Sequence, residues 1–518
     1  QLLEVLKRLT TFVGDHGNLV RVNYSDLDVE EFGSVYEGLL EYDPKVTKIG
    51  SNWEFSFVVG DDRSSSGSHY TPEELVKPLI KHSLDYIIAD KLKESNPEEA
   101  LLSITVCDVA CGSGHILLSA ARKIATELAS IREGAEQPSP TFYRAAIRDV
   151  IRNCIYGVDL NPLAVELCKV ALWLEAHNPN EPLNFLDHHI KNGNAIVGLA
   201  HFEELEKGIA DEAFKTLPDD DKTVAAEFRK RNALERKTTG QLSTYNIDKV
   251  DDNLQGLRKD FAAFVQLPET TPAEIKAKAE AYKKLTSGKK WFRLKNLADL
   301  QVAQFFIPKT TDNKPMFTTE AQYRTYLNSG TQILDRGASM SISAEKKFFH
   351  WFLEFPQVFA NGGFDCILGN PPFLGGQKLT GTYGHSFTQF IQYEYAPISS
   401  VDLVTYFFRR IYSIVRQGGF QSLISTNTVA QGAAKEGGLD VILKQDGEIN
   451  HAVRSIKWPG LAAVEVSLVT IHKGAWVGLS TLNGRLVNQI NSYLDDHISN
   501  GNPVVLLSNA KKSFQGSI

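Results

Sequence analysis

The sequence predicts an α/β fold, a Rossmann-like, doubly wound mixed sheet with an N-terminal helical segment and a helical insertion. Three observations support this fold class. Short apolar strands alternate with helices over residues 104–177, a glycine-rich turn follows the first of these strands, and the alternation resumes at residue 364. Strands that alternate with helices form parallel sheets covered on both faces, because each crossover helix packs back onto the sheet. A chain of 518 residues also exceeds one compact core, so we expect several domains.

The first predicted unit is the N-terminal helical segment, residues 1–60. Its opening apolar residues recur at helical spacing: Leu2, Leu3, Val5, Leu6 and Leu9. Residues 61–67 are rich in Ser and Gly and predict a loop. A long amphipathic helix should then begin at Thr71, which suits the N-cap position, with Pro72 in the first turn.

Residues 61–202 and 346–475 form the two predicted halves of the sheet. In order, their elements are strand 104–109, helix 115–130, strand 155–158, helix 162–177, and strands 364–368, 420–426 and 464–471. Between the halves, residues 203–345 are rich in Ala, Lys, Glu and Asp, and predict a mostly helical insertion. Its charged residues, Glu269 among them, should lie on solvated faces. Residues 476–518 form the last predicted unit.

Composition narrows the class of protein without identifying a partner. The net charge of −7 is neutral evidence on nucleic-acid binding, since a local groove can be basic in an acidic chain. No apolar run approaches the roughly 20 residues that span a bilayer, so we expect no membrane segment. The cysteines lie in apolar segments without a second ligand pair, which predicts buried reduced thiols and no metal site: Cys107, Cys111, Cys154, Cys168 and Cys366.

A glycine-rich motif follows the first strand of the predicted sheet. It consists of Asp108, Val109, Ala110, Cys111, Gly112, Ser113 and Gly114. The glycines allow a tight turn and close approach of a ligand, and the following helix offers free N–H donors. Asp108 adds a carboxylate that can pair with the amino group of a bound amino acid. An ordinary strand–helix turn has a similar sequence, so the motif by itself leaves both interpretations open.

A second acid, Asp159, ends the next predicted strand. A carboxylate at this position can accept hydrogen bonds from both ribose hydroxyls of a nucleoside cofactor. Asp159 or Asn161 would also serve as the N-cap of the following helix, and both roles are compatible. No Lys follows in a phosphate-loop pattern, which disfavours a nucleoside triphosphate.

The third motif is Asn370, Pro371, Pro372 and Phe373, directly after strand 364–368. Two prolines end the strand and stiffen the turn. A rigid exposed loop is the simpler interpretation. Such a loop would also fix a carboxamide and a carbonyl as acceptors for the amino group of a planar base, with Phe373 as a stacking surface.

Taken in this order, the motifs resemble the gamma-class N6-adenine DNA methyltransferases. Further segments resemble those of large type IIG/IIL restriction–modification enzymes and of BREX or DISARM phage-defence methyltransferases: residues 34–37, 186–190, 426–428 and 431–432. The resemblance assigns cofactor contacts to Tyr70, Thr71, Pro72, Asp108, Ala110, Cys111, Gly112, Gly114, Asp159, Leu160, Asn194 and Ala195. It assigns catalysis to Asn370–Phe373, and stacking of the target base to Phe373 and Trp458. Asn194 stands where many relatives have Asp, and Phe373 replaces the commoner Tyr.

The resemblance implies a class I methyltransferase fold in which residues 61–202 bind cofactor and residues 346–475 are the catalytic half. It implies S-adenosyl-L-methionine as cofactor, no metal, and methylation of adenine N6 by base flipping and direct SN2 transfer. Double-stranded DNA is the expected partner, other defence-system subunits are further candidates, and the expected location is cytoplasmic. Residues 476–518 resemble the lead-in to a target-recognition domain. Two alternatives remain: methylation of an RNA or protein glutamine nitrogen, and a non-catalytic DNA-binding subunit.

Overall fold

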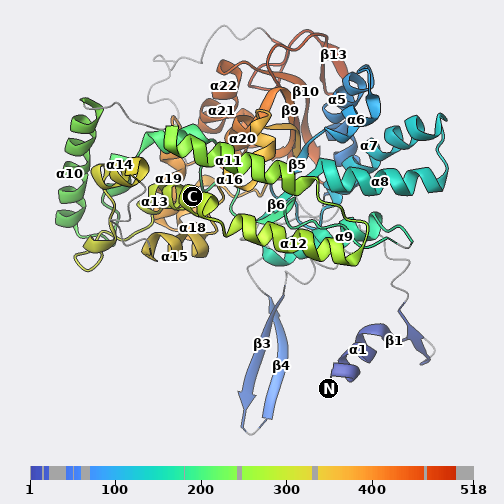
Figure 1. The fold of residues 1–518 in the computed structure, drawn as a ribbon, viewed down its shortest axis with the longest axis horizontal. Helices are drawn as coiled ribbons and strands as arrows, with labels where there is room; N and C mark the ends of the chain where they lie inside the picture. The colour runs from blue at the N-terminus through green and yellow to red at the C-terminus, as the bar shows by residue number, and fades with distance from the viewer. Residues whose placement is uncertain are drawn as a thin grey trace, which may run out of the picture.

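A computed structural model describes residues 2–14, 17–22, 42–50, 52–59, 71–179, 181–241, 248–329, 337–459 and 464–497. Its centre is a nine-stranded sheet (Figure 1). The strands are β5 (Val106–Asp108), β6 (Ile155–Asp159), β7 (Ile190–Asn192), β8 (Phe364–Gly369), β9 (Val415–Thr426), β10 (Gly447–Lys457), β11 (Glu465–Lys473), β12 (Ser480–Leu482) and β13 (Arg485–Val487). Their order across the sheet is β13-β12-β10-β11-β9-β8-β5-β6-β7.

The sheet is mixed, as the sequence predicts. Strands β7, β6, β5, β8 and β9 run parallel to one another, whereas β11 is antiparallel to both β9 and β10. The strand order and the single reversed strand between β9 and β10 are those of the class I methyltransferase fold. The predicted α/β fold class is therefore confirmed.

Two hydrophobic clusters cover the two faces of the sheet. Successive residues of a strand point to opposite faces, and Val106 joins one cluster while Cys107 joins the other. One face is covered by α4 (Glu73–Lys81), α5 (Leu84–Lys91), α6 (Pro97–Leu102), α7 (His115–Glu133), α8 (Pro140–Cys154) and α9 (Pro162–Glu175). The other is covered by α16 (Trp351–Glu354), α17 (Pro356–Ala360), α19 (His385–Glu394), α20 (Leu403–Ile414), α22 (Leu439–Lys444) and the insertion. Two short helices, α18 (Gly376–Tyr383) and α21 (Gly432–Gly437), also lie within residues 346–475.

The helix predicted from Thr71 needs correction. Helix α4 begins at Glu73 with Pro72 in the N-cap position, and no side chain caps it. The predicted single helix is also broken at Ser83, where α5 starts, because the Ser83 hydroxyl donates back to the carbonyl of Leu79. Ser and Thr side chains that bond to the preceding turn commonly bend or interrupt helices.

Within its described ranges, the N-terminal segment is helical at its start and otherwise forms strands, so the predicted helical structure is wrong over those strands. After α1 (Leu2–Thr10) come short strands β1 (Thr11–Val13) and β2 (Leu19–Arg21). An antiparallel hairpin, β3 (Tyr42–Ile49) and β4 (Asn52–Val59), then projects away from the sheet (Figure 1). In β4, the aromatic residues Trp53, Phe55 and Phe57 recur at every second position, a period that is typical of strands and not of a helix. Two of them face residues of β3, in the pairs Lys48–Trp53 and Val46–Phe55.

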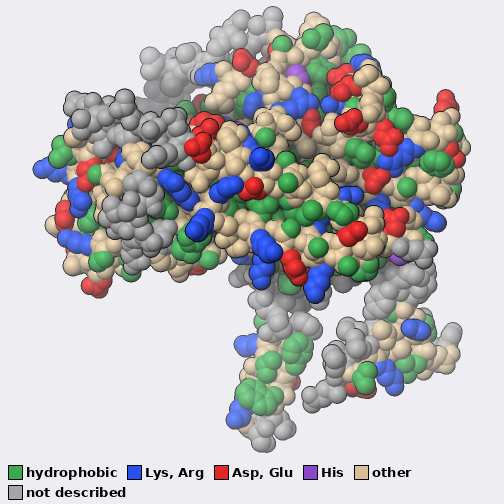
Figure 2. Space-filling model, in the orientation of Figure 1, with side chains coloured by type: hydrophobic (Ala, Val, Ile, Leu, Met, Phe, Trp, Pro, Cys, Tyr) green, Lys and Arg blue, Asp and Glu red, His purple; other side chains and the backbone are tan. Residues whose placement is uncertain are grey.

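The insertion consists of helices over most of its described length. They are α10 (Lys222–Gln241), α11 (Asp248–Val265), α12 (Pro272–Thr286), α13 (Lys289–Ala303), α14 (Glu320–Ser329) and α15 (Gly337–Lys346). Lys and Arg side chains are prominent on its outer surface (Figure 2). Its apolar side chains join the same hydrophobic cluster as one face of the sheet. The insertion is therefore packed into the core rather than attached to it by linkers. Across the described ranges, no helix has the length and apolar character needed to cross a bilayer.

The boundary predicted at residue 476 also needs correction. Strand β12 pairs with β10 in parallel, and β13 pairs with β12, so both strands extend the central sheet. Short strands of three residues carry too little periodicity to be recognised in a sequence. Residues 498–518, on which the expected lead-in to a recognition domain largely rests, lie outside the described residues.

We predict that Gly198→Ala destabilises the fold, because a Cβ there would lie 2.1 Å from the Phe349 carbonyl oxygen and the backbone has a φ of +142°. The expected loss in free energy of unfolding is about 1–3 kcal/mol, typical of overpacking. Gly381→Ala is the matched control, since this helical glycine faces open space and should gain about 0.5–1 kcal/mol. Chemical denaturation measures both values, and equal stability of the two variants would contradict the prediction.

Candidate functional site

The predicted site residues gather at one edge of the sheet. Parallel strands end at the same edge, and Asp108, Asp159 and Asn370 are the last residues of, or directly follow, β5, β6 and β8. Open α/β sheets bind ligands at this carboxyl edge. Gly369 lies so close to Asp108 that a Cβ on it would be 3.0 Å from the Asp108 Oδ1 atom. The glycine-rich motif and the tetrapeptide are thus direct neighbours, although more than 250 residues separate them in the sequence.

The glycine-rich motif forms a tight turn between β5 and α7. The Asp108 Oδ1 atom accepts from the backbone N–H of Ala110 at 3.0 Å, and the N–H of Cys111 donates to the Val158 carbonyl at 3.1 Å. Gly114, which precedes α7, has a φ of +89°, and a Cβ on it would lie 2.7 Å from the Cys168 sulfur. Only glycine fits there, and the start of α7 remains available for an anionic group.

Asp108 is a buried carboxyl group. Its pKa is raised to about 7, chiefly by burial and also by the nearby Asp159 carboxylate, against the lowering effect of the hydrogen bond from the Ala110 N–H. A cationic ligand group beside Asp108 would reverse this effect by stabilising the ionised form. The ionised form of Asp108 is therefore stabilised when a cationic ligand group binds beside it.

Asp159 holds the glycine turn in place. Its Oδ2 atom accepts from the N–H of Gly112 at 2.9 Å, and its Oδ1 atom accepts from the N–H of Asn161 at 2.8 Å. The N-cap of α9 is Asn161, whose side chain accepts from Leu163. Of the two capping residues that the sequence allowed, the structure selects Asn161. Asp159 thus keeps its carboxylate at the carboxyl edge of the sheet.

Two residues that the sequence analysis did not single out hold the backbone at Asp159 and Leu160. Asn192, at the end of β7, donates its amide to the carbonyls of Asp159 and Leu160, each at 2.9 Å. Lys347 donates its ammonium to the same Leu160 carbonyl at 2.7 Å. Asn192 lies two residues before Asn194, to which the resemblance assigns a cofactor contact, and this proximity is a signal in the sequence. Lys347 gave none, because it follows the insertion.

Asn194 uses its carboxamide locally. Its Oδ1 atom accepts from the N–H of Ile196 at 3.3 Å, and its own N–H donates to the Lys347 carbonyl at 2.7 Å. A carboxamide oxygen has two lone pairs, so one remains for a ligand. Its neighbour Ala195 is buried.

The tetrapeptide presents one buried acceptor. The Asn370 Nδ2 atom donates to the Thr71 hydroxyl at 3.1 Å. The Asn370 Oδ1 atom is buried and has no hydrogen-bond partner in the structure. Buried polar atoms are nearly always satisfied, so this oxygen, at the ligand-binding edge of the sheet, is a candidate contact for a ligand.

Asp402 fixes the loop that follows the tetrapeptide. Its Oδ1 atom accepts from the N–H groups of Leu374 and Val404, both at 3.2 Å, and Val404 lies in the first turn of α20. Its Oδ2 atom accepts from the Thr426 hydroxyl at 3.4 Å. One carboxylate thus joins the tetrapeptide loop to α20 and to the end of β9.

The two proposed stacking residues, Phe373 and Trp458, are half-buried at the rim of this edge. Both pack against the hydrophobic cluster that covers the α7 face of the sheet. The N–H of Trp458 donates to the Val464 carbonyl at 2.9 Å, between the end of β10 and the start of β11. Tyr70 lies outside the described residues, and Leu160 is exposed.

The residues present fit S-adenosyl-L-methionine. Asp108 can pair with its ammonium group, Asp159 can accept from a ribose diol, and the start of α7 can bind its carboxylate. The buried carboxyl of Asp108 and the tight glycine turn are the observations that support the fit.

The chain is similar to several known proteins over part of their length. It is 23% identical over 355 residues to a putative type II restriction enzyme and methyltransferase of Methanocaldococcus jannaschii, covering 59% of this chain and 28% of the relative. It is 21% identical to the adenine-specific methyltransferase BrxX of Escherichia coli, covering 74% of this chain and 26% of the relative. The chain thus spans about a quarter of the length of these curated relatives.

Among solved structures, the DNA complex of the type IIL restriction–modification enzyme MmeI is similar at 15% identity and a TM-score of 0.43, covering 92% of this chain and 45% of that one. The N-6 DNA methylase profile matches residues 28–207. The Eco57I restriction-modification methylase profile matches residues 153–454, more than half of the chain. With the tetrapeptide, the glycine-rich motif and both acids at one edge of a class I sheet, the chain belongs to the Eco57I restriction-modification methylase family.

Proposed function

We propose that this protein transfers a methyl group from S-adenosyl-L-methionine to the N6 atom of adenine in double-stranded DNA. We further propose that it works in the cytoplasm within a restriction–modification or phage-defence system, where other subunits would be partners. The observation that carries the proposal is the buried, unpartnered Oδ1 atom of Asn370 beside the glycine-rich motif. The name of BrxX, an adenine-specific methyltransferase, supports the choice of base.

The proposed chemistry needs two acceptors and no covalent enzyme intermediate. The N6 lone pair of adenine is delocalised into the ring and is a weak nucleophile. The Asn370 Oδ1 atom and the Pro371 carbonyl would accept from the two N6 hydrogens and so favour a pyramidal nitrogen. S-adenosyl-L-methionine, held by Asp108, Asp159 and the start of α7, would supply the methyl group. The new N–C bond would form as the S–C bond breaks, and the extra N6 proton would leave to solvent. Catalysis then comes from positioning and polarisation.

Thr71 sets which end of the Asn370 carboxamide faces the substrate. Because its hydroxyl accepts from Nδ2, the carbonyl oxygen is left for the amino group of the base. A flipped carboxamide would present a donor to another donor. Thr71 thus acts through Asn370 as a positioning residue, in addition to its expected cofactor contact.

The target base would have to leave the duplex to reach Asn370. Enzymes that modify a base take it out of the stack and hold it between aromatic side chains. Phe373 lies within the tetrapeptide, and Trp458 lies at the turn between β10 and β11. We assign the two faces of the flipped adenine to these two rings.

Asn370→Ala should abolish methyl transfer while S-adenosyl-L-methionine still binds. Removing one such polar contact typically lowers the rate by about 100- to 1,000-fold. The measurement is transfer of a labelled methyl group to duplex DNA, with structured RNA and protein as parallel substrates, and calorimetry for cofactor binding. Retained activity in the variant would refute the assignment of Asn370, and transfer by the wild type to RNA or protein alone would refute DNA as substrate.

Thr71→Val should lower kcat by roughly 10- to 100-fold, because the Asn370 carboxamide would lose its fixed orientation. Thr71→Ser keeps the hydroxyl and should restore most of the rate. Steady-state kinetics on duplex DNA compare the two variants. If valine and serine variants are equally impaired, the hydroxyl does not orient Asn370.

Burial raises the pKa of Asp108 to about 7. Cofactor affinity should therefore rise as the pH rises through this value. Below this pH the free protein holds a proton on Asp108, and the proton must leave before the carboxylate can pair with an ammonium group. The slope is at most about tenfold per pH unit for one proton. Calorimetry should find this slope in the wild type and a weaker, flat profile in Asp108→Asn. A wild-type affinity that falls over this range would contradict the assignment.

A further inference from the structure

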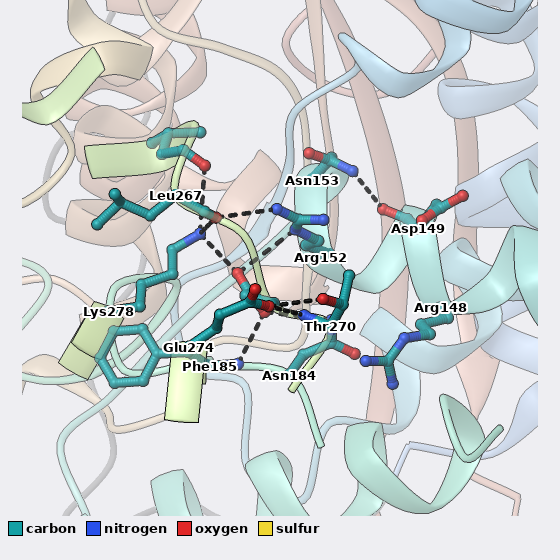
Figure 3. A network of polar contacts seen from close by, with 12 residues as sticks. Arg148, Asp149, Arg152, Asn153, Asn184, Phe185, Leu267, Thr270, Glu274 and Lys278 are labelled. Atoms are coloured by element: carbon teal, nitrogen blue, oxygen red, sulfur yellow. Dashed lines mark hydrogen bonds and ion pairs between the residues drawn. The ribbon is translucent and has the colours of Figure 1, made fainter. Parts of the chain in front are cut away.

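A buried polar network links the insertion to the core, and Figure 3 shows Lys278 of the insertion near Arg152, Asn184 and Phe185 of the core. Glu269, just before α12, and Lys278, within α12, lie 2.6 Å apart, and each side chain is 1% exposed. The sequence predicted solvated faces for this segment, and at these two residues that prediction is wrong. Lys278 lies on the buried face of α12, where the Glu269 carboxylate pairs with its ammonium group.

Glu269 connects the pair to the core. Its Oε2 atom accepts from the N–H of Phe185 at 3.1 Å and from the Asn184 amide at 3.4 Å. Its Oε1 atom also lies 3.4 Å from the Nε atom of Arg152 in α8. A buried carboxylate with a full set of donors is held rigidly, and loss of one partner leaves an uncompensated charge.

The segment that Glu269 holds leads directly into β7. The Phe185 ring meets the ring of Tyr282 in α12 at 5.6 Å. Lys191, in β7, places its ammonium 5.5 Å from the Tyr282 ring and 2.8 Å from the Glu354 carboxylate. Helix α12 therefore contacts the chain on both sides of residues 186–190.

The end of β7 in turn holds the proposed ribose-binding acid. Beside the two bonds from the Asn192 amide, the N–H of Gly193 donates to the Asp159 carbonyl at 2.9 Å. An unbroken series of contacts thus runs from Glu269 through Phe185 and β7 to Asp159. Contact alone does not establish coupling, so the series needs a test that separates positioning from general stability.

We infer that Glu269 and Lys278 are positioning residues for the cofactor site, and that the insertion sets the affinity for S-adenosyl-L-methionine through β7. The inference rests on the proposed function. The insertion is then a working part of the methyltransferase core in addition to carrying exposed Lys and Arg side chains.

Glu269→Gln is the test variant, and Glu320→Gln is its matched control. Glu320 is equally buried, accepts from the N–H of Ile209 at 2.7 Å and pairs with Arg324 at 2.6 Å, but its contacts stay within residues 206–324. Each variant removes the carboxylate partner of a cation, Lys278 with 1% and Arg324 with 15% of its side chain exposed, so both should lose stability. Tyr282→Phe is a milder second variant, which keeps the ring and removes only the hydroxyl near Lys191.

Calorimetry should find cofactor affinity lowered about tenfold in Glu269→Gln, less than the roughly 100-fold that a 1 Å misplacement can cause. Tyr282→Phe should lower it less, and Glu320→Gln should leave it unchanged. With saturating cofactor, kcat should stay within about twofold of wild type in all three, since the tetrapeptide is untouched. Hydrogen exchange in the cofactor-free proteins should show faster exchange over residues 185–194 in Glu269→Gln alone.

Equal loss of affinity in Glu269→Gln and Glu320→Gln would overturn the inference, because general destabilisation would then explain both. Unchanged affinity in Tyr282→Phe together with unchanged exchange over residues 185–194 in Glu269→Gln would also overturn it. Failure of the proposed function has a different signature: the wild-type protein itself would bind no S-adenosyl-L-methionine or would methylate no adenine.

Discussion

The hydrogen bond from the Asn370 amide to the Thr71 hydroxyl joins residues 299 positions apart, and the site exists only if the fold brings them together. Glu73 extends the same junction, because its carboxylate accepts from Ser119 and lies 3.2 Å from His115, both in α7. The start of α4, the start of α7 and the end of β8 thus meet at one point. A change in packing that displaces α4, α7 or β8 would therefore also displace the Asn370 Oδ1 atom, the acceptor that the proposed chemistry needs.

Much of the core could be predicted because its signals are local. The strand before Asp108, the turn at Gly112 and the tetrapeptide after β8 each lie within a few adjacent residues, and the structure places them as the sequence indicates. The two halves of the sheet also follow from alternation of strands and helices. A resemblance to a known family added the roles of the residues, which spacing alone left open.

The errors share a physical cause, which is dependence on distant partners. Thr71 has the right residue type for an N-cap, yet its hydroxyl serves Asn370 instead. Glu269 and Lys278 look solvated in a charged helical sequence, and are buried because Phe185 and Arg152 lie opposite them. Lys347 could not be linked to Leu160 across the whole insertion. Sequence patterns report the period of an element, not the identity of what it packs against.

The entry and exit of the insertion lie side by side, since the N–H groups of Trp351 and Phe352 donate to the carbonyls of Leu199 and Ala200 at 2.9 and 3.1 Å. The entropic cost of closing a loop between two such ends grows slowly with loop length, by about 0.6 kcal/mol for each doubling. Evolution could therefore exchange or lengthen this module without rebuilding the sheet. A replacement would have to supply the apolar side chains that cover this face of the sheet. It would also need a carboxylate for Phe185 and an aromatic ring for Lys191. A graft that carried these features would keep the methyltransferase core intact around a new outer surface.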